Sequence, residues 1–173
     1  MLTAPKVRLL LLVLTASGVL SGMGATARAD SGSDSTVANV VVDTSITLTA
    51  MTPSFTLRGI PGETVTEKSA VSMRVTTNNL AGYVVTVRPV STELVGSIPG
   101  NDDVIPTSLL EVRGPEQGNG FTSLTPGAPV QVASSAVRAV PGGDIIDSDY
   151  RITIPPVRSD TYSGTLDYVA TTL

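Results

Sequence analysis

The chain contains no cysteine, no histidine and no tryptophan among its 173 residues. Without cysteine there are no disulfides and no thiol nucleophile, and without histidine the commonest general base is missing. A Ser-His-Asp or Cys-His active site and a His-liganded zinc or copper site are therefore excluded. Lys68 lies near no known nucleophile motif, so a Ser-Lys site has no support either. We expect no enzymatic activity, and a carboxylate-based hydrolase ranks as the last of three functional hypotheses.

Aromatic residues are scarce, with four tyrosines and two phenylalanines. Sugar-binding platforms usually present an exposed aromatic face. Here Tyr83, Tyr150 and Tyr168 are in phase with the apolar residues of their predicted strands, which predicts a place in the core. The composition therefore does not favour carbohydrate binding.

The beginning of the chain has the three-part layout of a secretory signal peptide. Lys6 and Arg8 precede an apolar run over residues 9–20, and residues 27–29 read Ala-Arg-Ala. The apolar run is shorter than the roughly 20 residues that span a bilayer. We therefore predict a cleaved signal peptide over residues 1–29 and a secreted, extracellular protein that is free or associated with the cell surface.

The chain beyond residue 29 is acidic. The first 29 residues hold three of the 11 basic side chains and none of the 15 acidic ones, which leaves the remainder with a formal net charge of −7. A negative domain repels nucleic acid and anionic lipid surfaces. We expect no nucleic-acid partner, and no membrane contact after signal cleavage.

Alternation of apolar and polar residues at period two dominates the rest of the sequence. Residues 30–36 are small and polar and predict a flexible N-terminus. In residues 37–173, about nine or ten short alternating segments are separated by Gly- and Pro-rich turns. Residues 71–75 and 54–58 are examples of such predicted strands. The pattern predicts one all-β domain, an antiparallel β-sandwich of immunoglobulin-like, Greek-key character.

Two acidic loops are the candidate metal site. Calcium prefers several carboxylate and carbonyl oxygens, although the spacing here matches no EF-hand. The alternative is a pair of solvated turns whose carboxylates accept local backbone hydrogen bonds. The candidate calcium ligands are Asp144, Asp147 and Asp149, which follow a Pro-Gly-Gly turn, and Asp102 and Asp103, which follow Asn101.

Two segments carry a resemblance to known proteins. Residues 78–87 (NNLAGYVVTV) and 159–168 (SDTYSGTLDY) resemble strands of small secreted actinobacterial β-sandwich proteins that lack an assigned function. They are also distantly similar to Gram-positive surface domains of the WxL type. The resemblance implies a β-sandwich, but the Trp motifs that give WxL domains their wall-binding role are absent. Tyr162 resembles a tyrosine corner, which implies a stabilising role.

These observations favour a non-enzymatic structural or interaction module outside the cell. Its partner would be a protein, a component of the cell envelope or a second copy of the chain. A sheet edge that pairs with a partner strand is one means of binding, and the Val-rich residues 37–42 are a candidate strand. The second hypothesis is a secreted module that binds calcium or a small ligand through residues 101–103 and 144–149.

Overall fold

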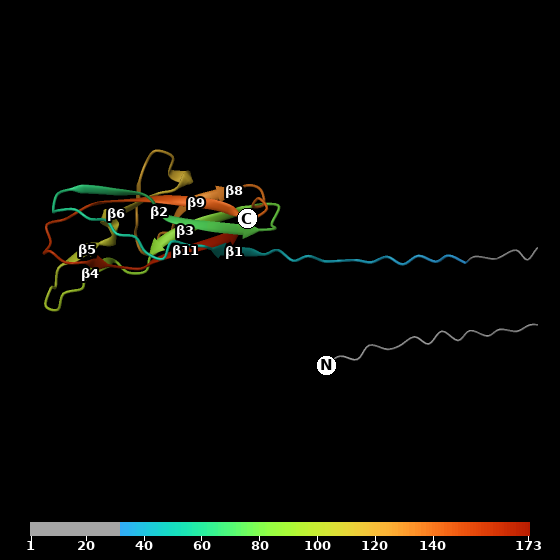
Figure 1. Ribbon diagram of the computed structural model, residues 1–173, viewed down its shortest axis with the longest axis horizontal. Helices are drawn as coiled ribbons and strands as arrows, with labels where there is room; N and C mark the ends of the chain where they lie inside the picture. Colours follow the sequence, from blue (N-terminus) through green and yellow to red (C-terminus); the bar gives the residue numbers. More distant parts are fainter. Residues whose placement is uncertain (1–31) are drawn as a thin grey trace, which may run out of the picture. The chain divides into compact units, whose positions relative to one another are not determined.

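The computed structural model describes residues 32–173, so the predicted signal peptide lies outside the described residues. The described part is all-β with antiparallel sheets (Figure 1). Residues 32–173 contain no α-helix, and their two helical turns are the short 3₁₀ segments η1 (Thr107–Leu109) and η2 (Pro115–Gln117). The predicted all-β antiparallel class is confirmed. The contacts group Val41–Leu173 as one unit, whereas residues 32–40 form no strand.

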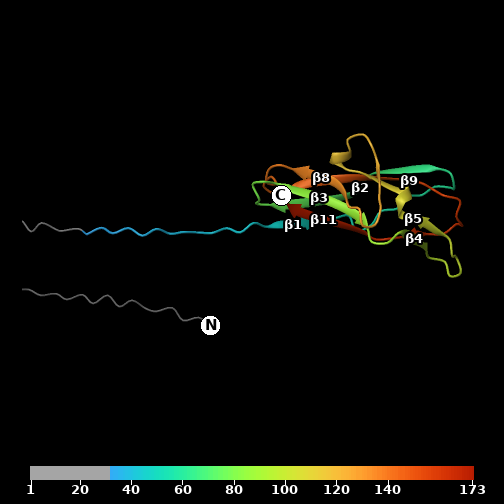
Figure 2. The same cartoon turned by 180° about the vertical axis from the view of Figure 1, so that it is seen from behind.

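The largest sheet has five strands. In spatial order, the strands are β1 (Ile46–Thr49), β2 (Thr64–Thr77), β9 (Asp144–Thr153), β6 (Leu110–Arg113) and β7 (Thr122–Ser123). Its two long strands, β2 and β9, pair antiparallel, and Figures 1 and 2 show them side by side.

Two further sheets have three strands each. In spatial order, one consists of β11 (Leu166–Thr172), β3 (Tyr83–Pro89) and β8 (Val130–Ser135). The other consists of β10 (Tyr162–Ser163), β4 (Glu93–Gly96) and β5 (Val104–Pro106). In both orders the first strand is an edge strand with a partner on one side only.

The period-two pattern of the sequence produces the core. In β3, Tyr83, Val85 and Val87 are buried and alternate with more exposed residues, and β9 and β2 alternate in the same way. Side chains from β2, β3, β6, β8 and β9 form one hydrophobic cluster. Successive side chains of a strand point to opposite faces, so a single alternating segment supplies both core and surface. The predicted core positions of Tyr83 and Tyr150 are confirmed.

A bulge interrupts the pairing of β2 with β9. Glu67 faces Tyr150 and Val71 faces Ser148, so residues 68–70 fall where β9 supplies one residue. Ser69 has a φ of 48°, in the left-handed region. Its N–H donates to the Asp149 carboxylate (Oδ1) at 2.8 Å. The bulge is therefore held by a side chain of the neighbouring strand.

Candidate functional site

Residues 51–61 belong to no strand or sheet. Phe55 and Leu57 turn inward against the core, whereas Ser54, Thr56 and Arg58 are exposed. The Phe55 ring lies 4.5 Å from the Tyr150 ring, centroid to centroid. This alternation is the one that predicts a strand over residues 54–58, but no hydrogen bond joins the main chain of residues 53–59 to the rest of the described chain. The predicted strand over residues 54–58 is therefore wrong, although the inward and outward directions of its side chains are right.

The two ends of this segment are tied to the five-stranded sheet. At the first end, the Thr52 N–H donates to the Ser72 carbonyl oxygen at 2.9 Å, and the Ser72 N–H donates to Thr52 Oγ1 at 2.9 Å. The next residue is Pro53, which has no N–H and cannot continue a ladder. At the other end, the Gly62 N–H donates to the Ile154 carbonyl oxygen at 2.8 Å. The chain between these two ties therefore has free main-chain donors and acceptors.

Edge strands β10 and β11 stand on the other side of a groove. Strand β10 pairs only with β4, and β11 pairs only with β3. Strand β1 lies beside β11 without pairing with it. The chain from residue 157 to residue 168 lines the same groove as residues 51–61. The unpaired main chain of residues 53–59 and the edges of β10 and β11 therefore border one space.

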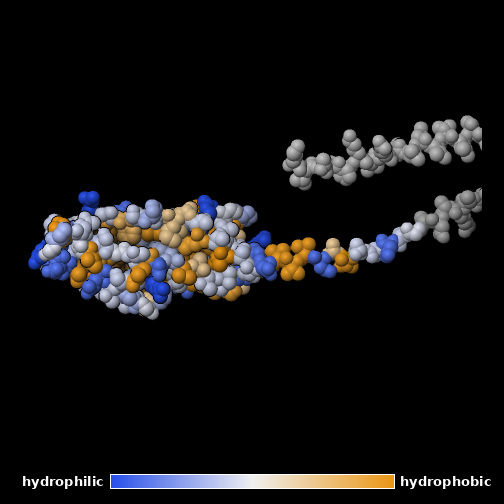
Figure 3. Space-filling view, turned by 90° about the horizontal axis from the view of Figure 1, so that it is seen from below, coloured by the Kyte–Doolittle hydropathy of each residue, from blue (hydrophilic) through white to orange (hydrophobic). Residues whose placement is uncertain are grey.

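The groove has a volume of ≈ 1020 Å³ and an apolar floor. Figure 3 shows the molecule of Figure 1 as seen from below. Several apolar patches lie on this face, where β4, β11 and β1 are found. Main-chain groups at the walls and apolar side chains at the base are what an added strand needs. The floor residues are Val71, Leu94, Ile105, Leu110, Ile152 and Ile154.

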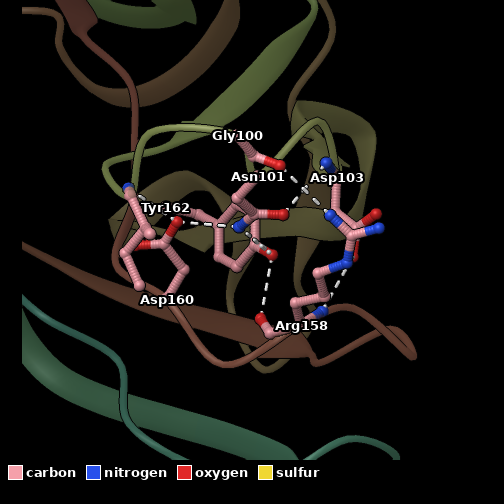
Figure 4. A network of polar contacts seen from close by, with 7 residues as sticks. Gly100, Asn101, Asp103, Arg158, Asp160 and Tyr162 are labelled. Atoms are coloured by element: carbon pink, nitrogen blue, oxygen red, sulfur yellow. Dashed lines mark hydrogen bonds and ion pairs between the residues drawn. The ribbon is translucent and has the colours of Figure 1, made fainter.

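A polar network fixes one wall of the groove to the loop between β4 and β5. At its centre is Asp160, which lines the groove. Figure 4 shows Asp160 beside Asn101 and Tyr162. Its Oδ2 accepts hydrogen bonds from Asn101 Nδ2 at 2.7 Å and from the Ile98 N–H at 3.0 Å. Its Oδ1 accepts from Ser97 Oγ at 2.7 Å and from the Thr161 N–H at 2.6 Å. Four donors therefore converge on one carboxylate.

These contacts determine the charge state of Asp160. Desolvation by the surrounding loops acts to raise its pKa. The hydrogen bonds from Asn101, Ile98, Ser97 and Thr161 act in the opposite direction and together hold the pKa well below its ordinary value. Asp160 is therefore a carboxylate at neutral pH and serves as an acceptor for its loop, not as an acid.

Tyr162 and Arg158 extend the network. Tyr162 Oη donates to the Arg158 carbonyl oxygen at 2.9 Å, four residues upstream, and accepts from Asn101 Nδ2 at 3.1 Å. The Arg158 N–H donates to Asp103 Oδ2 at 2.9 Å. Tyr162 thus has the upstream hydrogen bond that its resemblance to a tyrosine corner implies. The network holds residues 158–162 in place, although they belong mostly to loop.

The predicted acidic ligands after the Pro-Gly-Gly turn lie on both faces of β9. Asp144 is on the inner face, where Oδ2 accepts from Tyr83 Oη at 2.7 Å. Burial, reinforced by this contact with a carboxylate, raises the pKa of Tyr83. Asp147 is exposed on the outer face, opposite Ser72 of β2. Asp149 shares that outer face but is bonded to Arg113.

The other predicted group is also separated. Asp102 is exposed, whereas Asp103 is bonded to Arg158. Within residues 32–173, no three acidic side chains gather into a group that could hold a metal ion. Calcium binding by these five residues stays a prediction, and the structure brings them to no shared centre.

The outer face of β9 and β6 holds a second polar cluster. Arg113 Nε donates to Asp149 Oδ2 at 3.0 Å, and Arg151 Nε donates to Glu111 Oε2 at 2.7 Å. The two guanidinium groups lie over the Phe121 ring, 4.6 Å and 4.2 Å from its centroid. Partial burial acts to raise the pKa of Asp149, but hydrogen bonds from Arg113 and Ser69 and the nearby positive charge lower it overall. Each charge in this cluster has a partner within the chain.

The sequence-based analysis missed the groove and the part played by Asp160. The sequence held one local signal for Asp160: this acid follows a loop and stands at the start of an alternating segment. The ligand-like residues that it favoured, Asp144 and Asp149, serve instead as acceptors for Tyr83 and Arg113.

Comparison with known proteins finds no family model that matches this chain and no curated protein that matches its sequence. In the part of the chain that the structure describes, no helix is long and apolar enough to cross a membrane. The fold and the groove therefore place this chain in the class of all-β proteins that have unpaired strand edges.

Proposed function

We propose that this protein is a non-enzymatic interaction module that binds an extended segment of a protein partner in the groove. The observation that supports this most directly is the unbonded main chain of residues 53–59, which lines an apolar groove together with edge strands β10 and β11. A strand laid between these walls would satisfy their donors and acceptors. Its alternate side chains would bury themselves against the floor.

The same arrangement suggests a finer description of the fold. We take the domain to be a β-sandwich with immunoglobulin-like, Greek-key character in which one strand position is empty. Inward residues of the five-stranded sheet and of β3 and β8 share one core, as the two sheets of a sandwich do. The segment of residues 51–61 would then be a wall beside the empty position.

The place of action follows from the predicted signal peptide over residues 1–29. Outside the cell, the module would meet a protein partner or a component of the cell envelope. The acidic charge and the groove favour a protein segment over nucleic acid or an anionic lipid surface.

The test uses a synthetic eight-residue peptide of alternating valine and threonine and the purified protein. Amide hydrogen exchange is measured with and without the peptide. We expect protection of residues 54–59 and of β11, because their main-chain groups would join a new ladder. The matched control is the same peptide with alternate backbone amides N-methylated, which keeps every side chain but removes the donors on one edge. Equal binding of both peptides, or no protection at the groove, would contradict the proposed function.

A further inference from the structure

We propose that the partner segment is residues 37–42 of a second copy of this chain. This inference rests on the proposed function, since it names the occupant of the same groove. Residues 32–45 form no strand, and the four valines of the segment are among the most exposed large apolar residues of the described chain. Their exposed fractions are Val37 81%, Val40 86%, Val41 87% and Val42 76%. Such a run is typical of an interaction site. Figure 3 shows the apolar colour along this segment.

The residues of the segment fit a donated strand. Valine favours the extended, half-buried state of a strand. In an extended chain, Ala38, Val40 and Val42 share one face, whereas Val37, Asn39, Val41 and Asp43 lie on the other. The first face is apolar throughout and matches the floor of the groove. The second face carries the polar side chains together with two valines and would point to solvent.

Hydrogen bonds hold residues 43–45, which connect the segment to β1, in an open arrangement. Asn78 Nδ2 donates to the Asp43 carbonyl oxygen at 2.8 Å, and the Ser45 N–H donates to Asn78 Oδ1 at 2.8 Å. Thr77 Oγ1 donates to the Ser45 carbonyl oxygen at 2.6 Å. A tight turn over residues 43–45 would break these bonds. A second copy is therefore the occupant that the chain favours.

Charge favours the same pairing. Arg58 lines the groove and forms no ion pair within residues 32–173. The donated segment lies between two acids, Asp34 and Asp43.

Because the donor segment and the acceptor groove are different surfaces, the contact between copies is head-to-tail. Repetition of such a contact gives open chains or rings of copies.

The test compares two single substitutions that add the same charge to neighbouring residues. Val40→Asp places a carboxylate on the face predicted to meet the floor, and Asn39→Asp places it on the face predicted to meet solvent. Oligomer size is measured by light scattering over a range of protein concentrations. We expect the native chain and Asn39→Asp to form concentration-dependent oligomers, and Val40→Asp to weaken association by at least about tenfold.

A peptide of residues 35–44 then separates this inference from the proposed function. It is added to the Val40→Asp protein, whose groove is intact, and we expect it to protect residues 54–59 from exchange. If the valine–threonine peptide protects them and the 35–44 peptide does not, self-donation is wrong and the strand-binding function stands. If neither peptide protects them, both proposals are wrong. A native chain that stays monomeric at all concentrations, or equal oligomers for both variants, would also overturn self-donation.

Discussion

Polar groups of the cluster on the outer face of β9 have partners within the described chain, whereas the main-chain groups of residues 53–59 at the groove have none. On the outer face, Arg113 and Arg151 each have a carboxylate partner and share the Phe121 ring. In the groove, the main chain of residues 53–59 has no partner. Most polar groups of a native protein are satisfied within the chain or by solvent. The satisfied face therefore stabilises the fold, and the open main chain is where an external strand gains hydrogen bonds.

The largest effect is expected where the groove segment meets the core. Phe55→Ala removes a half-buried ring that packs on Tyr150. We expect a loss of about 2 kcal/mol in the free energy of unfolding, less than for a fully buried phenylalanine, measured by urea denaturation. Exchange at residues 54–59 should not change, because these amides have no partner to lose. Faster exchange of these amides in the variant would show that they are bonded after all.

Asp149→Asn tests the satisfied face and should cost less. The substitution removes the charge that Arg113 and the Ser69 N–H stabilise at the bulge. We expect a loss of about 1–2 kcal/mol at pH 7. The native pKa of Asp149 is lowered, so its contribution is present above the unfolded value near 4 and is lost as pH falls through the native pKa.

The measurement for Asp149 is urea denaturation of both proteins between pH 7 and pH 2. The difference in stability should shrink steadily below about pH 4. Asp144→Asn, whose partner is Tyr83 rather than a cation, is the control on the same strand. A difference for Asp149→Asn that is independent of pH would mean that the charge does not hold the bulge.

Much of the fold could be predicted from the sequence, because alternation reports which face of a strand is buried. It placed Tyr83 and Tyr150 in the core, and it gave the correct directions for Phe55 and Leu57. Alternation carries no information on the hydrogen-bond partner of a strand. The absence of pairing over residues 53–59 could therefore not be read from the sequence.

The candidate site was harder to predict because its contacts join distant residues. Asp160 lies 59 residues from Asn101, and Asp149 lies 36 residues from Arg113 and 80 from Ser69. A carboxylate looks the same in a sequence whether it binds a metal, an arginine or an amide. Proximity in the chain therefore grouped Asp144, Asp147 and Asp149, although the pleat of β9 places them on two faces.

Asp160→Asn should loosen the wall of the groove with a smaller effect on the whole domain. It replaces the acceptor on which Ser97, Asn101 and two main-chain donors converge. We expect faster amide exchange at residues 98 and 161 while β2 and β9 keep their protection. The native pKa of Asp160 is lowered, so its contribution is present above the unfolded value near 4, and the native protein should come to resemble the variant as pH falls through the native pKa. Unchanged exchange in the loop between β4 and β5 would mean that the network does not hold the wall.

The smallest effect is expected at Asp147. The experiment on this residue also decides between a strand-binding module and a calcium-binding one. Asp147 is exposed, and its neighbours Asp144 and Asp149 are engaged by Tyr83 and Arg113. We expect Asp147→Asn to change the stability by less than about 0.5 kcal/mol, as exposed substitutions usually do. Thermal denaturation with added calcium and with chelator should give the same Tm for the native and variant proteins. A Tm that falls in chelator for the native protein alone would assign calcium to this face and would remove the contrast between a self-satisfied face and an open groove.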